Sequence, residues 1–298
     1  MKISVVLATY NGARFLDSQL KSIFKQSVVP NEVIICDDRS TDNTIEMLED
    51  LQKQFNLKIF RSEVNRGLIQ NFKWGISKVP SDHFIALCDQ DDIWEKDKLQ
   101  LNVEAITCID TPDIPCMTYS DLMVIDEHEK IKEQSFWHTT GRGNYEHCLE
   151  TLLFGNFVSG CTMLMNPALR QFSEDIPNSL KQNHDSWLAL VAFSMGKVSA
   201  LDRPLVKYRQ HSTNVTYNTT HNKRKNLYRK IQKHIRFTIN PREYLSPQFE
   251  LVGKFYNTYK DHPLFQHHEL FLKFLNLQGK SYIVQKLAMK RSFDSYWK

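Results

Sequence analysis

The sequence predicts an α/β fold, in which a mixed and mainly parallel sheet is flanked by helices and followed by a helical extension. Over the first 110 residues, short apolar runs alternate with segments of helical periodicity, and a polar cluster follows each apolar run. After residue 215 the pattern becomes helical. Strands that alternate with helices form parallel sheets covered on both faces, and ligands bind at the carboxyl ends of such strands. We therefore expect the functional residues in the segments that follow the strands.

Four strand-helix units make up residues 1–110. The predicted strands are the apolar runs ISVVLA, EVIICD, LKIF and HFIALC, and the predicted helices span residues 13–26, 41–54, 68–77 and 97–109. Short apolar runs bounded by polar turn residues are typical of buried strands. Beyond them the sequence predicts strands over 116–125, 160–165 and 197–208, and a helix over 185–195. No Gly- or Pro-rich linker interrupts residues 1–215, which we predict to form one domain.

Residues 216–298 are predicted to form a basic helical region. Leu227, Ile231, Ile235 and Ile239 recur every four residues, and seven lysines and arginines without an acid lie between residues 221 and 236. This pattern is typical of a basic amphipathic helix, which Asn240-Pro241 would end. Residues 263–297 predict further helix, interrupted at Gly279.

The net charge of +4 on 298 residues conceals two parts of opposite sign. Residues 1–200 carry 19 Lys and Arg against 28 Asp and Glu, a net charge of −9, and residues 201–298 carry 19 against 6, a net charge of +13. An acidic part is typical of a site that holds cations, and a basic part is typical of a surface that binds anions. With 41% apolar residues the chain can bury a sizeable core, which excludes a disordered protein.

Neither export nor a membrane span is expected. The N-terminal MKISVVLATYNG has an apolar run of only five residues and no small-residue cleavage site. The longest apolar candidate, 152–165, is interrupted by Gly155, Asn156, Ser159 and Gly160. The six cysteines lack paired CxxC spacing and several lie in apolar runs, so we expect reduced, structural thiols. These features predict a cytoplasmic protein.

Three carboxylates within four positions follow the fourth predicted strand, in Cys88-Asp89-Gln90-Asp91-Asp92-Ile93-Trp94. Like charges this close repel one another unless a divalent cation lies among them, and Mg2+ or Mn2+ prefers carboxylate oxygens. A solvated acidic turn or the first turn of a helix is an equal alternative, because carboxylates are favoured at helix N-termini.

A second acidic cluster, Asp37-Asp38-Arg39-Ser40-Thr41-Asp42, follows the second predicted strand. Ser40, Thr41 and Asp42 are expected to cap the helix that comes next. Asp38 is a candidate for base recognition, because a carboxylate accepts a hydrogen bond from the imide N–H of uracil or thymine, a group that cytosine lacks. Two acidic clusters on adjacent strand ends suit a nucleoside diphosphate, with the base at one and metal-bridged phosphates at the other.

Taken in order, these segments resemble the family 2 glycosyltransferases with the GT-A fold. The resemblance covers residues 2–212 and rests on VVLATYNG, IICDDRSTDNT, VNRGLIQNF, LCDQDDIWEKDKL, GNFVSGCTMLMN and NHDSWLALVA. It implies a catalytic domain over 1–215, with nucleotide-sugar binding in 1–110 and acceptor binding and the catalytic base in 111–215. It also implies that Thr9, Asn11 and Asp38 line the nucleotide pocket and that Arg66 lies near it.

The resemblance further identifies Asp89-Gln90-Asp91 as a DxD motif. Asp91 would be the main ligand of Mg2+ or Mn2+, Asp89 would lie near the ribose and the metal, and the role of Asp92 stays open. The segment Tyr208-Arg209-Gln210-His211-Ser212-Thr213-Asn214 resembles a YRxHxxN motif. In it, His211 would reach the metal or the diphosphate and Arg209 would neutralise phosphate charge. Structural roles for both are an equal alternative.

The catalytic base that the resemblance implies is Asp185, in Asn183-His184-Asp185-Ser186-Trp187. Inverting transfer is a single displacement at the anomeric carbon, so it needs one general base and a stabilised diphosphate leaving group. The alternative for Asp185 is an N-cap of the predicted helix. His184 is expected to be a structural hydrogen-bonding residue, and Trp94 and Trp187 are expected to be core or acceptor-wall aromatics.

Within the family, CDQDDIW, GNxVSGCT, HDxW and YRQHSxN are most similar to bacterial rhamnosyltransferases of cell-wall and capsular polysaccharide synthesis. This resemblance implies dTDP-L-rhamnose as the donor and a lipid-linked glycan as the acceptor. A UDP-hexose or UDP-N-acetylhexosamine donor stays open, because these motifs do not include the residues that read the sugar.

Two other classes of protein are less favoured. A nucleotidyltransferase is expected to carry a Gly-rich phosphate loop after its first strand, and Thr9-Tyr10-Asn11-Gly12 is not one. A nucleic-acid binder would use the basic 221–239 segment, but the regular apolar stripe of that segment better suits a helix on an anionic membrane leaflet. Ordinary packing of the stripe on the catalytic domain is the alternative. We therefore expect peripheral contact with the inner face of the cell membrane and no nucleic-acid partner.

Overall fold

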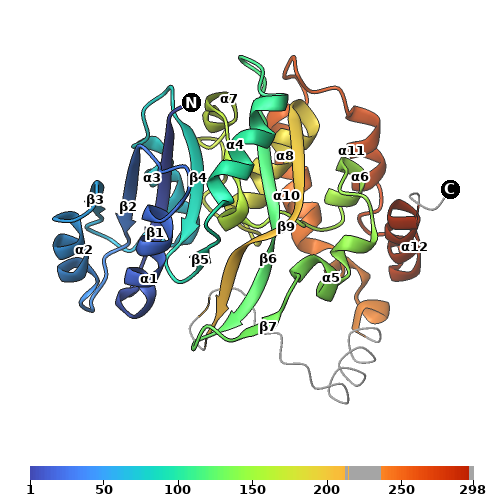
Figure 1. Cartoon of the computed structure of the whole chain (residues 1–298). Coiled ribbons are helices and arrows are strands. Elements are labelled where there is room, and N and C mark those ends of the chain that lie inside the picture. The colour runs from blue at the N-terminus through green and yellow to red at the C-terminus, as the bar shows by residue number, and fades with distance from the viewer. Residues whose placement is uncertain (212–213, 215–235, 295–298) are drawn as a thin grey trace.

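The computed structural model describes residues 1–211, 214 and 236–294. Within these residues a single sheet of nine strands runs through the molecule with the order β3-β2-β1-β4-β8-β6-β9-β5, and β7 pairs with β6 (Figure 1). Helices cover the sheet, so the predicted α/β fold is confirmed.

The N-terminal half is a parallel sheet built from four strand-helix units. Its strands are β1 (Ile3–Thr9), β2 (Glu32–Asp37), β3 (Leu57–Arg61) and β4 (Phe84–Asp89), which pair in parallel in the order β3-β2-β1-β4. The helices are α1 (Ala13–Phe24), α2 (Thr44–Gln52), α3 (Leu68–Ser77) and α4 (Lys98–Ile109). All eight elements lie where the sequence predicts them, with ends that differ by three residues or fewer.

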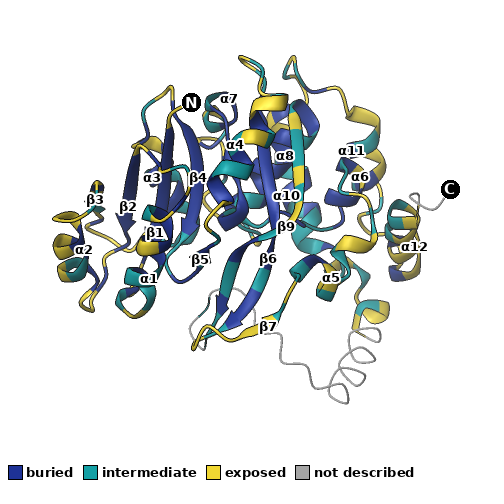
Figure 2. Ribbon diagram, in the orientation of Figure 1, coloured by how far each residue is buried: buried dark blue, intermediate teal, exposed yellow. Residues whose placement is uncertain are grey.

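The first strand, β1, is largely apolar because helices cover both faces of the sheet. Val5 and Leu7 belong to the core cluster that includes Leu16 of α1, whereas Val6 belongs to the one that includes Phe72 of α3. Successive side chains of a strand point to opposite faces, so a strand between two helix layers is apolar at most of its positions. Figure 2 shows the central strands as the most buried part of the molecule.

The second half of the sheet is mixed. Its strands are β5 (Ile93–Trp94), β6 (Cys116–Asp126), β7 (Ile131–Glu133), β8 (Leu164–Met165) and β9 (Lys197–Gln210). Its helices are α5 (Phe136–Thr140), α6 (Leu149–Leu152), α7 (Pro167–Gln171) and α8 (His184–Met195), with short 3-10 turns η1 (Arg142–Asn144) and η2 (Gly160–Thr162). The predicted strand over 160–165 is wrong in its first half, because the Thr162 N–H bonds the Ser159 carbonyl in a 3-10 turn and does not join the ladder.

The C-terminal helices pack on α8, on α6 and on one another. They are η3 (Pro241–Glu243), α10 (Ser246–Tyr259), α11 (His268–Leu275) and α12 (Tyr282–Asp294). The rings of Phe255 and Trp187 lie 5.3 Å apart in one apolar cluster. Gly279, with φ +82°, separates α11 from α12 and confirms the predicted interruption. The boundary near residue 215 stays a prediction, and residues 221–235 of the predicted basic helix lie outside the described residues.

No helix of the described residues combines the length and the apolar character that a membrane crossing requires. Four cysteines, Cys36, Cys88, Cys116 and Cys161, are buried, as their places in apolar runs predict.

Candidate active site

The loop after β1 and the loop after β4 are joined through the side chain of Gln90. Its Oε1 accepts hydrogen bonds from the Thr9 hydroxyl at 2.7 Å and the Tyr10 N–H at 2.8 Å, and its Nε2 donates to the Tyr10 carbonyl at 3.2 Å. The two loops meet because β1 and β4 are neighbours in the sheet. Gln90 therefore fixes the backbone between Asp89 and Asp91, a role that the motif pattern did not predict.

Gly12 has no side chain, and the Gln90 amide fills the space that a side chain at position 12 would need. A Cβ at position 12 would lie 2.3 Å from Gln90 Oε1 and 2.7 Å from Thr9 Oγ1. We expect Gly12→Ala to displace the Gln90 amide, to cost about 1–3 kcal/mol of stability and to weaken nucleotide-induced thermal stabilisation. The control is Gly253→Ala in α10, where the nearest atom is 3.8 Å away and alanine favours the helix. If both variants melt and bind nucleotide alike, the role of Gln90 is disproved.

Asp38 lies between the loops that follow β1, β2 and β3. Its own N–H donates to the Thr9 carbonyl at 2.8 Å, and its carboxylate accepts the Arg66 N–H at 2.6 Å and the Gly67 N–H at 2.8 Å. A carboxylate oxygen accepts more than one hydrogen bond, so each oxygen keeps a lone pair for a ligand. The Arg66 guanidinium is exposed and lies 4.6 Å from the Trp74 ring centroid. The structure thus brings Thr9, Asp38 and Arg66 together.

The other polar groups of the second acidic cluster bond mainly to Asn11 of the β1 loop and to the start of α2. The exposed Asn11 has φ +50°, its N–H donates to Ser40 Oγ, and its Oδ1 accepts the Thr41 N–H at 2.8 Å. Ser40 Oγ in turn donates to the buried Asp37. Of the three predicted caps, only Asp42 acts on α2, by accepting the Thr44 N–H at 3.1 Å. Ser40 and Thr41 hold the β1 loop instead, so the prediction that they cap the helix is wrong.

Asp89 at the end of β4 lies beside both Asp91 and Asp185. Burial and the charges of those two acids raise the pKa of Asp89 to about 7. Within the described residues its carboxylate has no hydrogen bond and no ion pair. The fold therefore brings the start of α8 to the acids that follow β4, and no cation of the described chain neutralises Asp89.

Asp91 pairs with His211. Their Oδ2 and Nε2 atoms lie 2.7 Å apart, and the imidazole also lies against the Phe15 ring at 4.9 Å. Two of the three residues predicted to hold the metal, Asp91 and His211, are thus in direct contact. Carboxylate and imidazole groups arranged in this way suit Mn2+ or Mg2+.

Arg209 is buried, and its guanidinium bonds protein groups. Its Nε donates to the Asp91 carbonyl at 2.8 Å, its N–H donates to Asp92 Oδ1 at 3.1 Å, and its terminal nitrogens bond the Glu127 carbonyl and the Glu129 carboxylate. Only 1% of its surface is exposed, and its hydrogen bonds hold the 91–92 backbone and side chain from the interior of the protein. The alternative in which Arg209 neutralises phosphate charge is therefore wrong.

A second group of possible ligands lies under the acidic loop. One atom each of Asp89, Asp92 and Cys161 lie within 4.8 Å of one another, and Asp92 Oδ2 is buried without a partner in the described chain. Burial and nearby acids raise the pKa of the Cys161 thiol well above its usual range. Cysteine sulfur is a soft ligand, whereas Mg2+ and Mn2+ prefer oxygen ligands. The residues that fit Mg2+ or Mn2+ are therefore Asp89 and Asp91, with His211 beside them.

Asp185 faces the 156–160 loop. Its Oδ1 accepts from Asn156 Nδ2 at 3.2 Å, and its Oδ2 accepts from the Gly160 N–H at 3.2 Å. The N-cap position of α8 is occupied by Asn183, so the N-cap alternative for Asp185 is wrong. The GNFVSGCT segment thus supplies hydrogen-bond partners of Asp185. The sequence pattern did not predict this role for the segment.

The neighbours of Asp185 in sequence are core residues. His184 stacks on Phe72 with ring centroids 4.1 Å apart, and neither of its ring nitrogens has a hydrogen-bond partner in the described chain. The expected hydrogen-bonding role of His184 is therefore wrong, and burial lowers its pKa. Trp187 and Trp94 are buried, so both are core aromatics and not an acceptor wall.

The pKa of Asp89 leads to a prediction about pH. Because this pKa is raised from 3.8 to about 7, the cation-free protein loses stability as the pH rises from about 4 to about 7. A divalent cation binds the deprotonated carboxylate and removes this loss. We expect Mn2+ to raise the Tm by at least about 2 °C more at pH 8 than at pH 5.5. Differential scanning fluorimetry at both pH values tests this, and equal Tm increases would contradict it.

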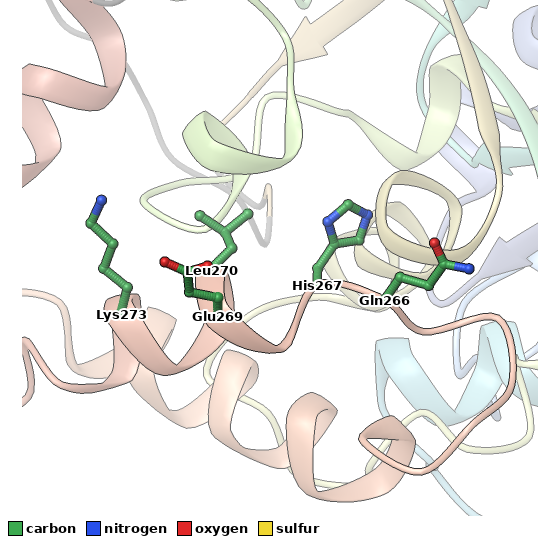
Figure 3. Close-up of a pocket in the computed structure, with 5 residues that line it drawn as sticks. All are labelled: Gln266, His267, Glu269, Leu270 and Lys273. Atoms are coloured by element: carbon green, nitrogen blue, oxygen red, sulfur yellow. The ribbon is translucent and has the colours of Figure 1, made fainter.

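A surface pocket lies elsewhere, on the C-terminal helices. It is lined by Gln266, His267, Glu269, Leu270 and Lys273, all from α11 and the segment before it (Figure 3). It contains none of the acids described above, so it is not part of the candidate site.

The strand order and the acids at the strand ends define the class of the protein, a GT-A glycosyltransferase. The family model for glycosyl transferase family 2 matches residues 4–164. The chain belongs to this family.

Known relatives agree with the assignment. The chain is 31% identical over 225 residues to a dTDP-rhamnosyl transferase RfbG of Shigella flexneri, an alignment that covers 70% of this chain and 72% of the relative. A crystal structure of S. aureus TarS 1-349 in complex with UDP-GlcNAc has a TM-score of 0.59 and 18% identity, covering 98% of this chain and 91% of that one. A Pyrobaculum calidifontis mannosyltransferase in complex with GDP-Man and Mn2+ has a TM-score of 0.53 and 16% identity, covering 98% and 85%. At this level of identity the two structures support the fold alone.

Proposed function

We propose that the protein is an inverting glycosyltransferase that moves one sugar from a nucleotide-diphosphate donor to a hydroxyl of a growing bacterial surface polysaccharide. The observation that carries this proposal is the position of Asp185 near Asp89: Asp185 accepts the Gly160 N–H at 3.2 Å, and the next residue, Cys161, has its sulfur within 4.8 Å of an Asp89 oxygen. One acid, in the first turn of α8, bonds the 156–160 loop, and two acids lie at a strand end where a diphosphate would bind. A single displacement needs this combination of a base and a leaving-group site.

In this mechanism Asp185 takes the proton of the acceptor hydroxyl. The acceptor oxygen forms its bond to the anomeric carbon as the bond from that carbon to the diphosphate oxygen breaks, so the anomeric configuration inverts. The Gly160 N–H and the Asn156 amide orient the Asp185 carboxylate. Asp91 and Asp89, with His211, would hold Mg2+ or Mn2+, which supplies positive charge to the leaving diphosphate.

For the nucleotide we propose Thr9, Asn11, Asp38 and Arg66. The lone pairs that Asp38 retains would accept the imide N–H of uracil or thymine. Arg66 would lie beside the base, because its backbone N–H is hydrogen-bonded to Asp38 and its guanidinium stacks on Trp74.

The donor we propose is dTDP-L-rhamnose, with a lipid-linked glycan as the acceptor. The similarity to the Shigella rhamnosyl transferase supports this choice. A UDP-linked hexose or N-acetylhexosamine is the second candidate, because TarS, a relative in fold, binds UDP-GlcNAc.

A panel of nucleotide sugars tests the proposal. Thermal shift and donor hydrolysis are measured with Mn2+ for dTDP-rhamnose, UDP-glucose, UDP-galactose and UDP-N-acetylglucosamine. We expect the largest Tm increase and the fastest hydrolysis with dTDP-rhamnose. A larger response to a UDP-sugar would replace the donor, and no response to any nucleotide sugar would disprove the function.

Peripheral contact with an anionic membrane is part of the proposal. Residues 221–235 are outside the described residues, but α12 adds an observation. Ile283, Val284 and Leu287 are 61%, 44% and 49% exposed on its outer face, and Lys286, Lys290 and Arg291 are exposed around them. Apolar residues ringed by cations are typical of surfaces that bind anionic lipid.

Vesicle flotation tests this contact with the whole chain. We expect binding to vesicles that contain phosphatidylglycerol and none to phosphatidylcholine vesicles. Replacing Ile283 and Leu287 by serine should weaken the binding, as should neutralising Lys223, Arg224, Lys225, Arg229 and Lys230. Binding that none of these changes affects would exclude both segments.

A further inference from the structure

Phe15, in the first turn of α1, contacts two residues that hold Asp91 in place. The centroid of its ring lies 4.9 Å from that of the His211 imidazole and 4.7 Å from the guanidinium carbon of Arg209. His211 Nε2 lies 2.7 Å from Asp91 Oδ2, and Arg209 Nε donates to the Asp91 carbonyl at 2.8 Å. One aromatic ring thus packs against the partners of both the carboxylate and the backbone of this acid.

The Phe15 ring is partly buried where three parts of the chain meet. Its N–H donates to the Gly12 carbonyl at 3.1 Å, which ties it to the loop after β1. The guanidinium carbon of Arg14 lies 4.8 Å from the ring, and Arg14 pairs with Glu127 at 2.7 Å. The Glu127 carbonyl also accepts from Arg209 at the end of β9. The ring therefore joins α1 to the turn after β6 and to β9.

Asn214 orders the backbone of this part of β9 and its end. The His211 N–H donates to Asn214 Oδ1, and Asn214 Nδ2 donates to the Arg209 carbonyl at 2.9 Å. These bonds fix the main chain but not the side-chain torsions, which have several staggered minima. The Phe15 ring contacts the two side chains themselves, so it restricts what Asn214 leaves open.

The contact with His211 limits the rotation of the imidazole. The hydrogen bond to Asp91 fixes one atom of that ring, about which the rest of the ring can still turn. Packing against a second flat ring, at an interplanar angle of 35°, disfavours such turning. The nitrogen that meets Asp91 is thereby held by two independent contacts.

The contact with Arg209 stabilises a buried charge. Arg209 is 1% exposed, and its ion pair with Glu129, at 3.2 Å, involves an acid that is 55% exposed. Ion pairs with exposed acids contribute little, whereas a desolvated guanidinium over an aromatic ring gains more. The ring therefore favours the position from which Arg209 bonds the Asp91 carbonyl.

We propose that Phe15 is a positioning residue of the cation site. Its ring holds the His211 imidazole and the Arg209 guanidinium against Asp91, so this acid is ordered before Mg2+ or Mn2+ binds. The proposal rests on the proposed function, because it takes Asp91 as a ligand of the cation. Without the ring, part of the binding free energy of the cation is spent on ordering these side chains.

Calorimetric titration of the whole metal-free protein with Mn2+ alone tests this role. We expect Phe15→Leu to raise the Kd for Mn2+ about tenfold. Phe15→Tyr keeps the ring and should stay within about twofold of the wild type. The matched control is Phe24→Leu, the same change at the other end of α1, where the ring stacks on Phe55 at 4.3 Å. It should lower the Tm but leave the Kd unchanged.

A double-mutant cycle with His211→Gln tests whether Phe15 acts through the imidazole. Phe15→Leu should weaken Mn2+ binding less in the His211→Gln protein than in the wild type, because part of its effect is already lost there. Circular dichroism checks the fold of each variant. Phe15→Met, with a flexible apolar side chain, replaces Phe15→Leu if the leucine variant does not fold.

Four results would overturn the role of Phe15. These are an unchanged Kd in Phe15→Leu, an equal loss of Mn2+ affinity in Phe24→Leu, an equal loss in Phe15→Tyr, and losses that add fully in the cycle. A wild type that binds no Mn2+ would refute the cation of the proposed function and this role with it. An error in the donor sugar alone leaves the test unaffected, since no nucleotide sugar is present.

Discussion

Asp185→Asn is expected to lower the rate of glycosyl transfer by about 10²- to 10⁴-fold. The asparagine keeps the size of the side chain, and its Oδ1 still accepts a hydrogen bond from the 156–160 loop, but the amide cannot take a proton from the acceptor. Affinity for the donor nucleotide should stay within about twofold, because the change acts on the chemical step. Turnover and nucleotide affinity, measured on the same preparation, separate these effects.

The matched control for Asp185→Asn is Glu150→Gln, which removes an exposed acid from the first turn of α6. It should leave turnover unchanged. Near-normal transfer by Asp185→Asn would exclude Asp185 as the base. An equal loss of turnover and of nucleotide affinity would show that Asp185 helps to bind the donor.

Asp91→Asn has the second largest expected effect. Its carboxylate would be the main ligand of the cation, and a neutral amide oxygen is a weaker one. Loss of several kcal/mol of charge stabilisation in the transition state corresponds to a rate about 10²-fold lower or more. We also expect Asp91→Asn to abolish the Tm increase that Mn2+ causes, while His211 keeps a hydrogen-bond partner in the new amide.

Asp97→Asn is the control for Asp91→Asn, since Asp97 is an exposed acid a few positions along whose side chain caps no helix. It should keep both the Tm increase and the turnover. Titration with Mn2+ gives the decisive measurement. If Asp91→Asn binds Mn2+ as tightly as the wild type does, the cation lies elsewhere, and the group formed by Asp89, Asp92 and Cys161 becomes the next set to test.

Local pattern predicted the first half of the fold closely. The helix over 68–77 begins and ends where the periodicity of the sequence places it, because a side-chain period of 3.6 residues is a local property. The strand over 160–165 was predicted less well. Its apolar residues are buried as expected, but the Gly160 N–H bonds Asp185, so the segment turns before it reaches the sheet.

Arg209 and His211 illustrate the limit of motif interpretation within the candidate site. They are two residues apart in one motif, and the motif predicts contacts with the metal or the diphosphate for both. Arg209 is buried and donates to the backbone carbonyl of Asp91, whereas His211 contacts the carboxylate of Asp91. Motif spacing does not say which face of a segment is covered, and here that decides which residue can meet a ligand.

By itself, the sequence determined the α/β alternation, the acids at the strand ends and the division between an acidic and a basic part. These features depend on composition and on neighbours along the chain. Only the tertiary structure decided the partner of each polar group. Gln90 bonds the Tyr10 backbone, and Asp185 bonds the 156–160 loop that lies against Asp89. Such partners lie far apart in sequence and meet because of sheet order and helix packing, which no local period contains.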